Sequence, residues 1–394
     1  MIAKKMEGLV KGSSVIRAMF EEGKNMAKKY GAENVYDFSL GNPSVAPPED
    51  VKRAFVEEVE NEEPTFLHGY MSNTGYEDVR AAIAEHINEL HGTKFDGGNI
   101  IMTVGAAGGL NVVLRSLVDP DDEVMVIAPY FGEYDNYVAN ANGKVVVVAP
   151  NPPSFQPNLD EFEEKITART KVVIINTPNN PTGVVYSEDT LKKMGEILEA
   201  KGKEFGTDIY LLSDEPYREL VYDGVEVPYV TKYYANTIVG YSYSKSLSLP
   251  GERIGYLVIP SEVADFESVY AACGVATRIL GFVNAPSLQQ RVIMKSLKSS
   301  VDVSIYEKNR NLLLDHLKKL GFEVATPSGA FYLFVKCLEE DDKAFANKAK
   351  EENILVVPGS TFGCKGYVRI AYCVDYKMIE RALPAFERLA AKYK

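Results

Sequence analysis

The chain has 394 residues, which is long enough for two domains, since single hydrophobic cores stop growing at about 300 residues. Hydrophobic residues make up 46% and charged residues 25%, the proportions of an ordinary globular protein. The formal net charge of −12 argues against nucleic acid or a membrane surface as a partner, because both are usually bound by basic residues.

Cysteine and histidine spacing gives no sign of a disulfide frame or a metal site. The four cysteines form no C-x-x-C pair, and the four histidines do not recur at metal-ligand spacing. Packed free thiols of this kind are typical of a reducing compartment. The first residues, Met-Ile-Ala-Lys-Lys, lack the apolar core of a signal peptide, and no window approaches the roughly 20 apolar residues of a membrane span. We therefore expect a cytoplasmic protein without a bound metal.

The first 45 residues predict an arm that contains a helix and a short strand. Apolar residues such as Met19 and Met26 recur in the predicted helix, which should end at Gly31. A strand-like run at 36–40 then closes in a Gly-Asn-Pro turn. Helical spacing of apolar residues predicts two more helices, one after Pro48 and one that includes Val79.

From about residue 98 the pattern changes to short, continuously apolar runs. Such runs are typical of strands buried on both faces, as in a mostly parallel sheet covered by helices. They predict a large α/β domain with a seven-stranded sheet, whose ligands should gather at the carboxyl ends of the strands. The runs lie at 99–104, 123–128, 144–149, 171–176, 208–213, 236–241 and 254–259.

Beyond about residue 290 the pattern becomes α+β and predicts a smaller domain. A long helix is expected over 302–319. The last helical stretch should be interrupted at Pro384, because proline lacks the N–H that a helix requires. Strand-like runs between these helices lie at 322–325, 331–335, 354–357 and 367–371. The predicted division is an N-terminal arm at 1–45 that packs with the small domain, a large domain at 46–288 and a small domain at 289–394.

Lys245 follows one of the predicted buried strands. An unpaired ammonium group is costly to bury, so a lysine in this position either reaches solvent or has a chemical task. Desolvation lowers the pKa of a lysine and lets it form a Schiff base with an aldehyde. Ser242, Ser244 and Arg253 around it could bind an anion, such as a cofactor phosphate.

Chemically informative residues also follow other predicted strands. Each has an ordinary explanation by itself, because small residues close turns, aromatic residues fill cores and charged residues form ion pairs. Their recurrence at one end of consecutive strands instead predicts a single site. The segments are Gly105-Ala-Ala-Gly-Gly109, Ala128-Pro-Tyr-Phe131, Asn176-Thr-Pro-Asn-Asn-Pro-Thr-Gly183 and Asp214-Glu-Pro-Tyr217, followed far downstream by Arg369.

In this ordered set the chain resembles the class I/II aminotransferases of fold type I, which are pyridoxal-phosphate enzymes. The resemblance covers nearly the whole chain. It rests on Gly41-Asn-Pro43, Tyr70, Gly105-Ala-Ala107, Pro129-Tyr-Phe131, Asn180-Pro-Thr-Gly183, Asp214-Glu-Pro-Tyr217, the stretch from Ser242 through Lys245 to Arg253, and Arg369.

The resemblance implies a role for each of these residues. Lys245 would hold pyridoxal 5'-phosphate covalently and then transfer the substrate proton. Asp214 would pair with the pyridine nitrogen and keep the ring an electron sink. Tyr217 and Asn180 would bind the phenolic oxygen, and Phe131 would stack on the ring. The phosphate would be bound by Arg253, Ser242, Ser244 and the backbone amides of Ala106 and Ala107.

The same resemblance implies substrate contacts and a dimer. Arg369, helped by the backbone of Gly41 and by Asn180, would bind the α-carboxylate of an amino acid. Tyr70 would reach the phosphate of a neighbouring subunit, so the active unit should be a homodimer. Some relatives carry a lysine for a second substrate carboxylate where this chain has Ala107. Arg17 in the N-terminal arm could take its place or could simply be solvated.

The predicted function is transamination from an L-amino acid of aspartate, aromatic or alanine type to a 2-oxo acid, with 2-oxoglutarate as the expected acceptor. One alternative is a C–S lyase or related elimination enzyme, since the Ser-Leu-Pro-Gly-x-Arg stretch also occurs among such relatives. The other is a ligand-sensing module of a transcription regulator, which the acidity of the chain disfavours.

Overall fold

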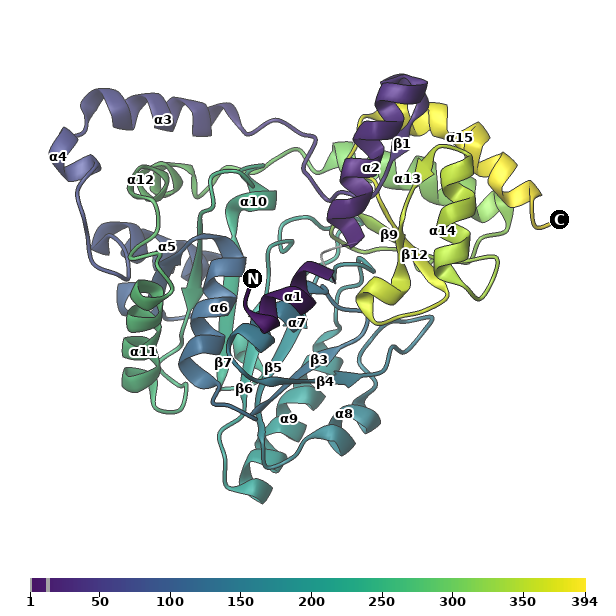
Figure 1. Cartoon of the computed structure of the whole chain (residues 1–394). Coiled ribbons are helices and arrows are strands. Elements are labelled where there is room, and N and C mark those ends of the chain that lie inside the picture. The colour runs from purple at the N-terminus through teal and green to yellow at the C-terminus, as the bar shows by residue number, and fades with distance from the viewer. Residues whose placement is uncertain (1, 12–14) are drawn as a thin grey trace.

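A seven-stranded sheet lies at the centre of the larger part of the molecule, in a computed structural model that describes residues 2–11 and 15–394 (Figure 1). The strand order is β2-β8-β7-β6-β5-β3-β4, and β8 runs antiparallel to both of its neighbours. The remaining pairs are parallel, as the continuously apolar runs predict. The strands are β2 (Ile100–Thr103), β3 (Glu123–Ile127), β4 (Lys144–Val148), β5 (Thr170–Asn176), β6 (Tyr210–Asp214), β7 (Thr237–Ser242) and β8 (Gly255–Val258).

Helices cover both faces of this sheet. Consecutive residues of β3 belong to separate hydrophobic clusters. Val124 belongs to the cluster that includes residues of α6, and Met125 to the cluster that includes residues of α8 and α9. The helices are α3 (Glu49–Asn61), α4 (Pro64–Leu67), α5 (Glu77–His91), α6 (Gly105–Leu117), α7 (Glu133–Asn140), α8 (Leu159–Lys165), α9 (Glu188–Phe205), α10 (Tyr243–Ser246), α11 (Phe266–Ile279) and α12 (Ser287–Ser296), with 3-10 turns η2 (Gly97–Asn99) and η3 (Val230–Lys232). None of the helices in the described part of the chain is long and apolar enough to cross a membrane.

The smaller part of the molecule combines the chain's two ends. Strand β1 of the arm pairs in parallel with β10, and in Figure 1 the purple α2 lies beside the yellow-green C-terminal elements. A three-stranded antiparallel sheet, β11-β12-β9, forms its other half. Helix α1 (Lys4–Lys11) comes first in the chain and is drawn apart from this part in Figure 1. The elements of the smaller part are α2 (Val15–Tyr30), η1 (Ala32–Asn34), β1 (Tyr36–Asp37), α13 (Ser304–Leu320), β9 (Tyr332–Lys336), α14 (Asp342–Glu351), β10 (Ile354–Leu355), β11 (Val357–Pro358), η4 (Gly359–Phe362), β12 (Tyr367–Ala371) and α15 (Tyr376–Ala391).

Two predictions about this part are wrong. Helix α15 continues through Pro384 as one helix, because its apolar face is buried over its whole length and packs on the small-domain core. The run at 322–325 forms no strand; Val324 makes only an isolated bridge to Val335.

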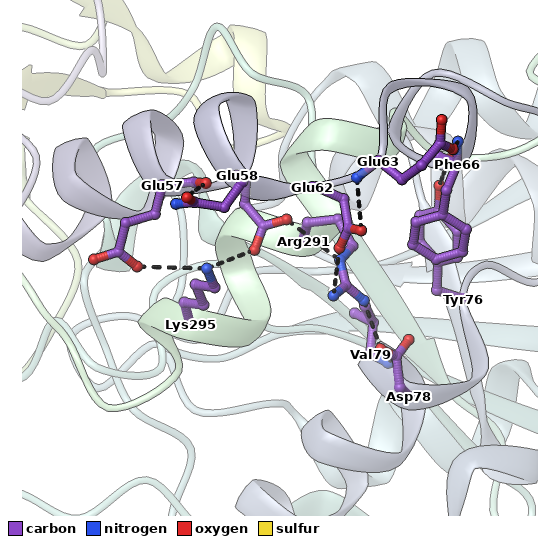
Figure 2. A network of polar contacts seen from close by, with 11 residues as sticks. Glu57, Glu58, Glu62, Glu63, Phe66, Tyr76, Asp78, Val79, Arg291 and Lys295 are labelled. Atoms are coloured by element: carbon purple, nitrogen blue, oxygen red, sulfur yellow. Dashed lines mark hydrogen bonds and ion pairs between the residues drawn. The ribbon is translucent and has the colours of Figure 1, made fainter.

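A buried ion network fixes the helices beside the site (Figure 2). Arg291 of α12 pairs with Glu58 and Glu62 of the α3 segment and with Asp78 of α5. Glu58 is only 2% exposed and also pairs with Lys295 at 2.9 Å. The Arg291 guanidinium also lies 5.6 Å from the ring centre of Phe66 and 5.8 Å from that of Tyr76. The network therefore holds the loop between α4 and α5, which carries Tyr70.

Replacing Arg291 with Ala is expected to lower the free energy of unfolding by about 2–3 kcal/mol, because it removes a partner from a buried carboxylate. Urea unfolding of the cofactor-free protein measures the change. The matched control is Lys298→Ala, which breaks the exposed pair with Glu89 and should change stability by less than about 1 kcal/mol. Equal effects of the two substitutions would contradict a structural role for the network.

Candidate active site

A cavity of about 360 Å³ lies at the carboxyl ends of the parallel strands, against the smaller part of the molecule. All the predicted site residues line it except Tyr70 and Arg17. They are Gly41, Ala106, Ala107, Phe131, Asn180, Asp214, Tyr217, Ser242, Ser244, Lys245, Arg253 and Arg369. Residues more than 300 positions apart are thus brought together, as the strand-end pattern predicts.

Lys245 lies in the one-turn helix α10, directly after β7. The pKa of its ammonium group is lowered to about 8, mainly by burial; Cys373 opposes the shift, and the nearby Arg369 and Arg253 add to it. Its Nζ donates to the backbone oxygen of Gly41 at 2.8 Å. At pH 7 about a tenth of this amine is therefore neutral and nucleophilic, far more than of an ordinary lysine.

Asp214 ends β6 and is buried. Its Oδ2 accepts a hydrogen bond from the hydroxyl of Tyr134 at 2.6 Å, whereas its Oδ1 has no partner in the described part of the chain. Burial raises the pKa of this carboxyl group to about 7, although the Tyr134 hydrogen bond opposes the rise. A buried carboxylate with a free oxygen requires a cationic partner, and a ligand in the cavity could supply it.

Arg369 of β12 is buried at the other side of the cavity. Its Nη1 donates to Oδ1 of Asn180 at 3.0 Å, and its Nη2 donates to the backbone oxygen of Ser39 at 2.6 Å. The guanidinium lies 4.5 Å from the centre of the Tyr332 ring and 5.0 Å from that of the Phe362 ring. Its buried Nε has no partner among the described residues, which leaves a donor for a ligand carboxylate.

An anion-binding corner joins α6, α10 and Arg253. The helix N-terminus of α6 presents the backbone N–H groups of Ala106 and Ala107, and the Oγ atoms of Ser242 and Ser244 lie 2.6 Å apart. A Cβ on Gly105 would lie 2.8 Å from the Arg253 guanidinium, so glycine leaves room for it. Arg253 itself has φ of 54°, an uncommon backbone conformation of the kind found at functional sites.

Sequence reasoning missed five polar residues that line this cavity: Glu133, Tyr134, Tyr137, Asn176 and Tyr332. Tyr134 lies in the first turn of α7, three residues after Phe131, and this spacing from a predicted site residue could have indicated it. Asn176 donates its side-chain amide to the Asp214 backbone and accepts from the Asn180 backbone, and it belongs to a segment already singled out. Tyr332 lies in a strand of the small domain, and its sequence neighbours give no signal of a site.

Tyr70 is not among the residues that line the cavity. It lies between α4 and α5 and is 93% exposed. Arg17 belongs to the range of α2, but its side chain lies outside the described residues, so its predicted role stays a prediction.

The lining fits pyridoxal phosphate by its own chemistry. A carboxylate with one unpaired oxygen suits a protonated ring nitrogen, and a lysine of lowered pKa suits an aldehyde. The helix N-terminus with two serines and Arg253 suits a phosphate. Together with the parallel sheet, this donor set defines a pyridoxal-phosphate enzyme of fold type I.

Comparison with known proteins gives the same result. Residues 33–386 match the family described as aminotransferase class I and II. The chain is 31% identical to an aspartate aminotransferase of Thermotoga maritima, over 93% of each chain. A crystal structure of an aminotransferase from Eubacterium rectale is 50% identical, with a TM-score of 0.97 and complete coverage of both chains. Thermus thermophilus aspartate aminotransferase with maleate is 28% identical, with a TM-score of 0.85 over 95% of this chain and 96% of that one. The chain belongs to this family of pyridoxal-phosphate-dependent aminotransferases.

Replacing Asp214 with Asn is expected to stabilise the cofactor-free protein at pH 8 by about 1–2 kcal/mol while weakening cofactor binding. The folded-state pKa, about 7, lies above the ordinary value of 3.8, so the charged carboxylate costs stability. That cost grows as the pH rises from about 4 to 7 and is constant above this range. Urea unfolding at pH 5 and pH 8 and a cofactor-binding titration measure both effects.

The control for Asp214 is Asp160→Asn, an exposed carboxylate on α8. The change in the free energy of unfolding caused by Asp160→Asn should be the same at pH 5 and pH 8. An Asp214→Asn variant that is equally destabilised at both pH values would contradict the burial cost assigned to the carboxylate.

Proposed function

We propose that the cavity moves an amino group from an L-amino acid to a 2-oxo acid in two half-reactions. The observation that carries the proposal is the pair of unpartnered atoms, Asp214 Oδ1 and Arg369 Nε, on a cavity that also contains the Lys245 amine. The first would hold the cofactor ring and the second the substrate carboxylate. Bound pyridoxal phosphate supplies the electron-withdrawing ring and carries the amino group between the half-reactions.

Lys245 would hold the cofactor and then move the substrate proton. Its lowered pKa lets it accept a proton near neutral pH and return it afterwards, which is the behaviour required of a general acid–base group. The Gly41 backbone oxygen, 2.8 Å from Nζ, orients the amine. Because Arg369 would fix the α-carboxylate of the substrate beside it, the α-carbon would lie within reach of the same amine.

The other lining residues would orient the cofactor. Tyr217 and Asn180 would hydrogen-bond its phenolic oxygen, and Phe131 would pack on its ring face. The phosphate would be held by Ser242, Ser244, Arg253 and the amides of Ala106 and Ala107, a helix N-terminus combined with a fixed positive charge.

The relatives' names support amino donors of aspartate and aromatic type, and alanine-type donors are part of the same proposal. The proposed acceptor is 2-oxoglutarate. Recognition of its second carboxylate would require a cation in addition to Arg369, for which Arg17 remains a candidate. Ala107 supplies none.

We further infer a homodimer in which Tyr70 completes the partner's phosphate site. Asn73 donates to the backbone oxygen of Val283 at 2.6 Å, so the Tyr70 loop lies next to the end of α11. Both segments expose apolar side chains that a partner could cover. They are Phe66, Tyr70, Ile279 and Val283.

Domain division and location belong to the same proposal. The arm, large domain and small domain would comprise 1–45, 46–288 and 289–394. Helix α12 spans the boundary at 288/289 and packs on α3 and α5 of the large domain, so we propose to move this boundary to the segment after α12, near Val301. The four cysteines are free and buried, which supports a cytoplasmic location.

The proposal is tested by following the absorption band of the bound cofactor. A panel of L-amino acids should convert the band, and a 2-oxo acid should restore it, with 2-oxoglutarate and pyruvate compared as acceptors. Lys245→Ala should abolish turnover and leave the cofactor-free protein folded. Release of ammonia and pyruvate from a cysteine conjugate without any acceptor would instead favour a lyase and overturn the proposal.

Complementation between two inactive variants tests the contribution of Tyr70. Lys245→Ala and Tyr70→Ala subunits are co-expressed with different tags, and the mixed dimer is purified. If Tyr70 acts on the partner's site, one site of the mixed dimer is intact, and about half of the wild-type activity per dimer returns. Activity no higher than that of the two parent variants would mean that Tyr70 does not act across the interface.

A further inference from the structure

Tyr332, which was not among the predicted site residues, contacts two of them, Tyr217 and Arg369. It is the first residue of β9, its side chain is buried, and it lines the cavity. Its hydroxyl lies 3.0 Å from the hydroxyl of Tyr217. Its ring lies 4.5 Å from the Arg369 guanidinium, within the range of a cation–π contact.

Gly41 makes room for this hydroxyl. A Cβ on Gly41 would lie 2.0 Å from the Tyr332 oxygen, far inside van der Waals contact. The backbone oxygen of the same glycine accepts the Lys245 hydrogen bond at 2.8 Å. Tyr332 therefore packs against the segment that orients the lysine, in addition to contacting Tyr217 and Arg369.

The direction of the Tyr217–Tyr332 hydrogen bond follows from the number of protons available. In the proposed function Tyr217 donates its single hydroxyl proton to the cofactor, so it can only accept from Tyr332. Burial raises the pKa of both hydroxyl groups, and Arg369 opposes the rise at both. The proton count therefore makes Tyr332 the donor.

We propose that Tyr332 is a positioning residue of the transamination site, whose hydroxyl donates to Tyr217 and whose ring holds Arg369 in place. The hydroxyl would fix the Tyr217 proton toward the phenolic oxygen of the cofactor. The ring, together with that of Phe362, would keep Arg369 in position for the substrate carboxylate. The inference rests on the proposed function, because that function assigns the cofactor to Tyr217 and the substrate carboxylate to Arg369.

Nearby buried tyrosines give the comparison that separates this role from ordinary packing. The hydroxyl groups of Tyr222 and Tyr372 both donate to the backbone oxygen of Ala330. A backbone carbonyl is the usual partner of a buried tyrosine, and it needs no catalytic explanation. The Tyr332 hydroxyl instead contacts another tyrosine that lines the cavity, so its loss should change the cofactor's properties.

The test compares Tyr332→Phe with the matched control Tyr222→Phe. Removing the Tyr332 hydroxyl weakens the Tyr217 hydrogen bond to the cofactor, so the cofactor holds its own proton more strongly. The pH midpoint of its absorption change should therefore rise by about 0.5–1 unit, and kcat should fall about fivefold. KM for the amino donor should stay within about twofold, because the phenylalanine ring still packs on Arg369. Tyr222→Phe should leave the midpoint unchanged.

A double-mutant cycle shows whether Tyr332 acts through Tyr217. Tyr217→Phe should raise the midpoint by itself, and adding Tyr332→Phe to it should produce no further rise. For the ring, Tyr332→Leu should raise KM about tenfold above that of Tyr332→Phe. Urea unfolding of the cofactor-free variants verifies that each one folds.

The outcomes distinguish this inference from the proposed function. A normal midpoint in Tyr217→Phe would overturn the role of Tyr217 and with it the inference. A raised midpoint in Tyr217→Phe with an unchanged one in Tyr332→Phe would overturn the hydroxyl role of Tyr332 alone. Additive shifts in the double variant would show that Tyr332 does not act through Tyr217, and equal KM values for Tyr332→Leu and Tyr332→Phe would refute the ring's role.

Discussion

Two buried charged side chains on the cavity, Asp214 and Arg369, constrain the rest of the site. Each uses part of its hydrogen-bonding capacity within the protein and keeps one buried atom, Oδ1 or Nε, without a partner among the described residues. Leaving such atoms unpaired costs free energy that packing elsewhere must offset. In the proposed function, bound ligands would pair with these atoms, and Lys245, whose amine also loses solvation, lines the same cavity.

The Arg369 contacts also explain why the chain needs three structural segments around one cavity. Its partners are the Ser39 backbone oxygen of the N-terminal arm and Asn180 of the large α/β part, whereas Arg369 itself belongs to β12. A movement of the smaller part relative to the sheet must therefore stretch or remake the Asn180 contact, whereas Ser39 and Arg369 belong to the same part. Binding of a substrate carboxylate to the remaining Nε would add a third hydrogen-bond partner and favour the arrangement in which all three segments meet.

Sequence reasoning could predict what depends on local pattern. The seven buried strands follow from continuous apolar runs, and the residues after them converge because parallel strands share one carboxyl edge. It could not predict that α15 would pass through Pro384, because tertiary packing of its apolar face outweighs a local propensity. It also missed Tyr134 and Tyr332, whose importance depends on partners 80 and 115 residues away. An aromatic residue in a strand or helix is far more often core than site.

A comparison among the buried arginines separates structural from ligand-binding roles in this fold. Arg218, Arg291 and Arg310 each pair with at least one carboxylate. Arg369, equally buried, has no ion-pair partner in the described chain; its guanidinium is held by an amide, a backbone oxygen and two aromatic rings. Neutral partners fix its position without neutralising its charge, because a protein carboxylate would compete with the substrate for the same fork of donors. In the proposed function, the lack of a protein carboxylate leaves this arginine free to bind the carboxylate of an amino acid, which an ordinary salt bridge at the same place would prevent.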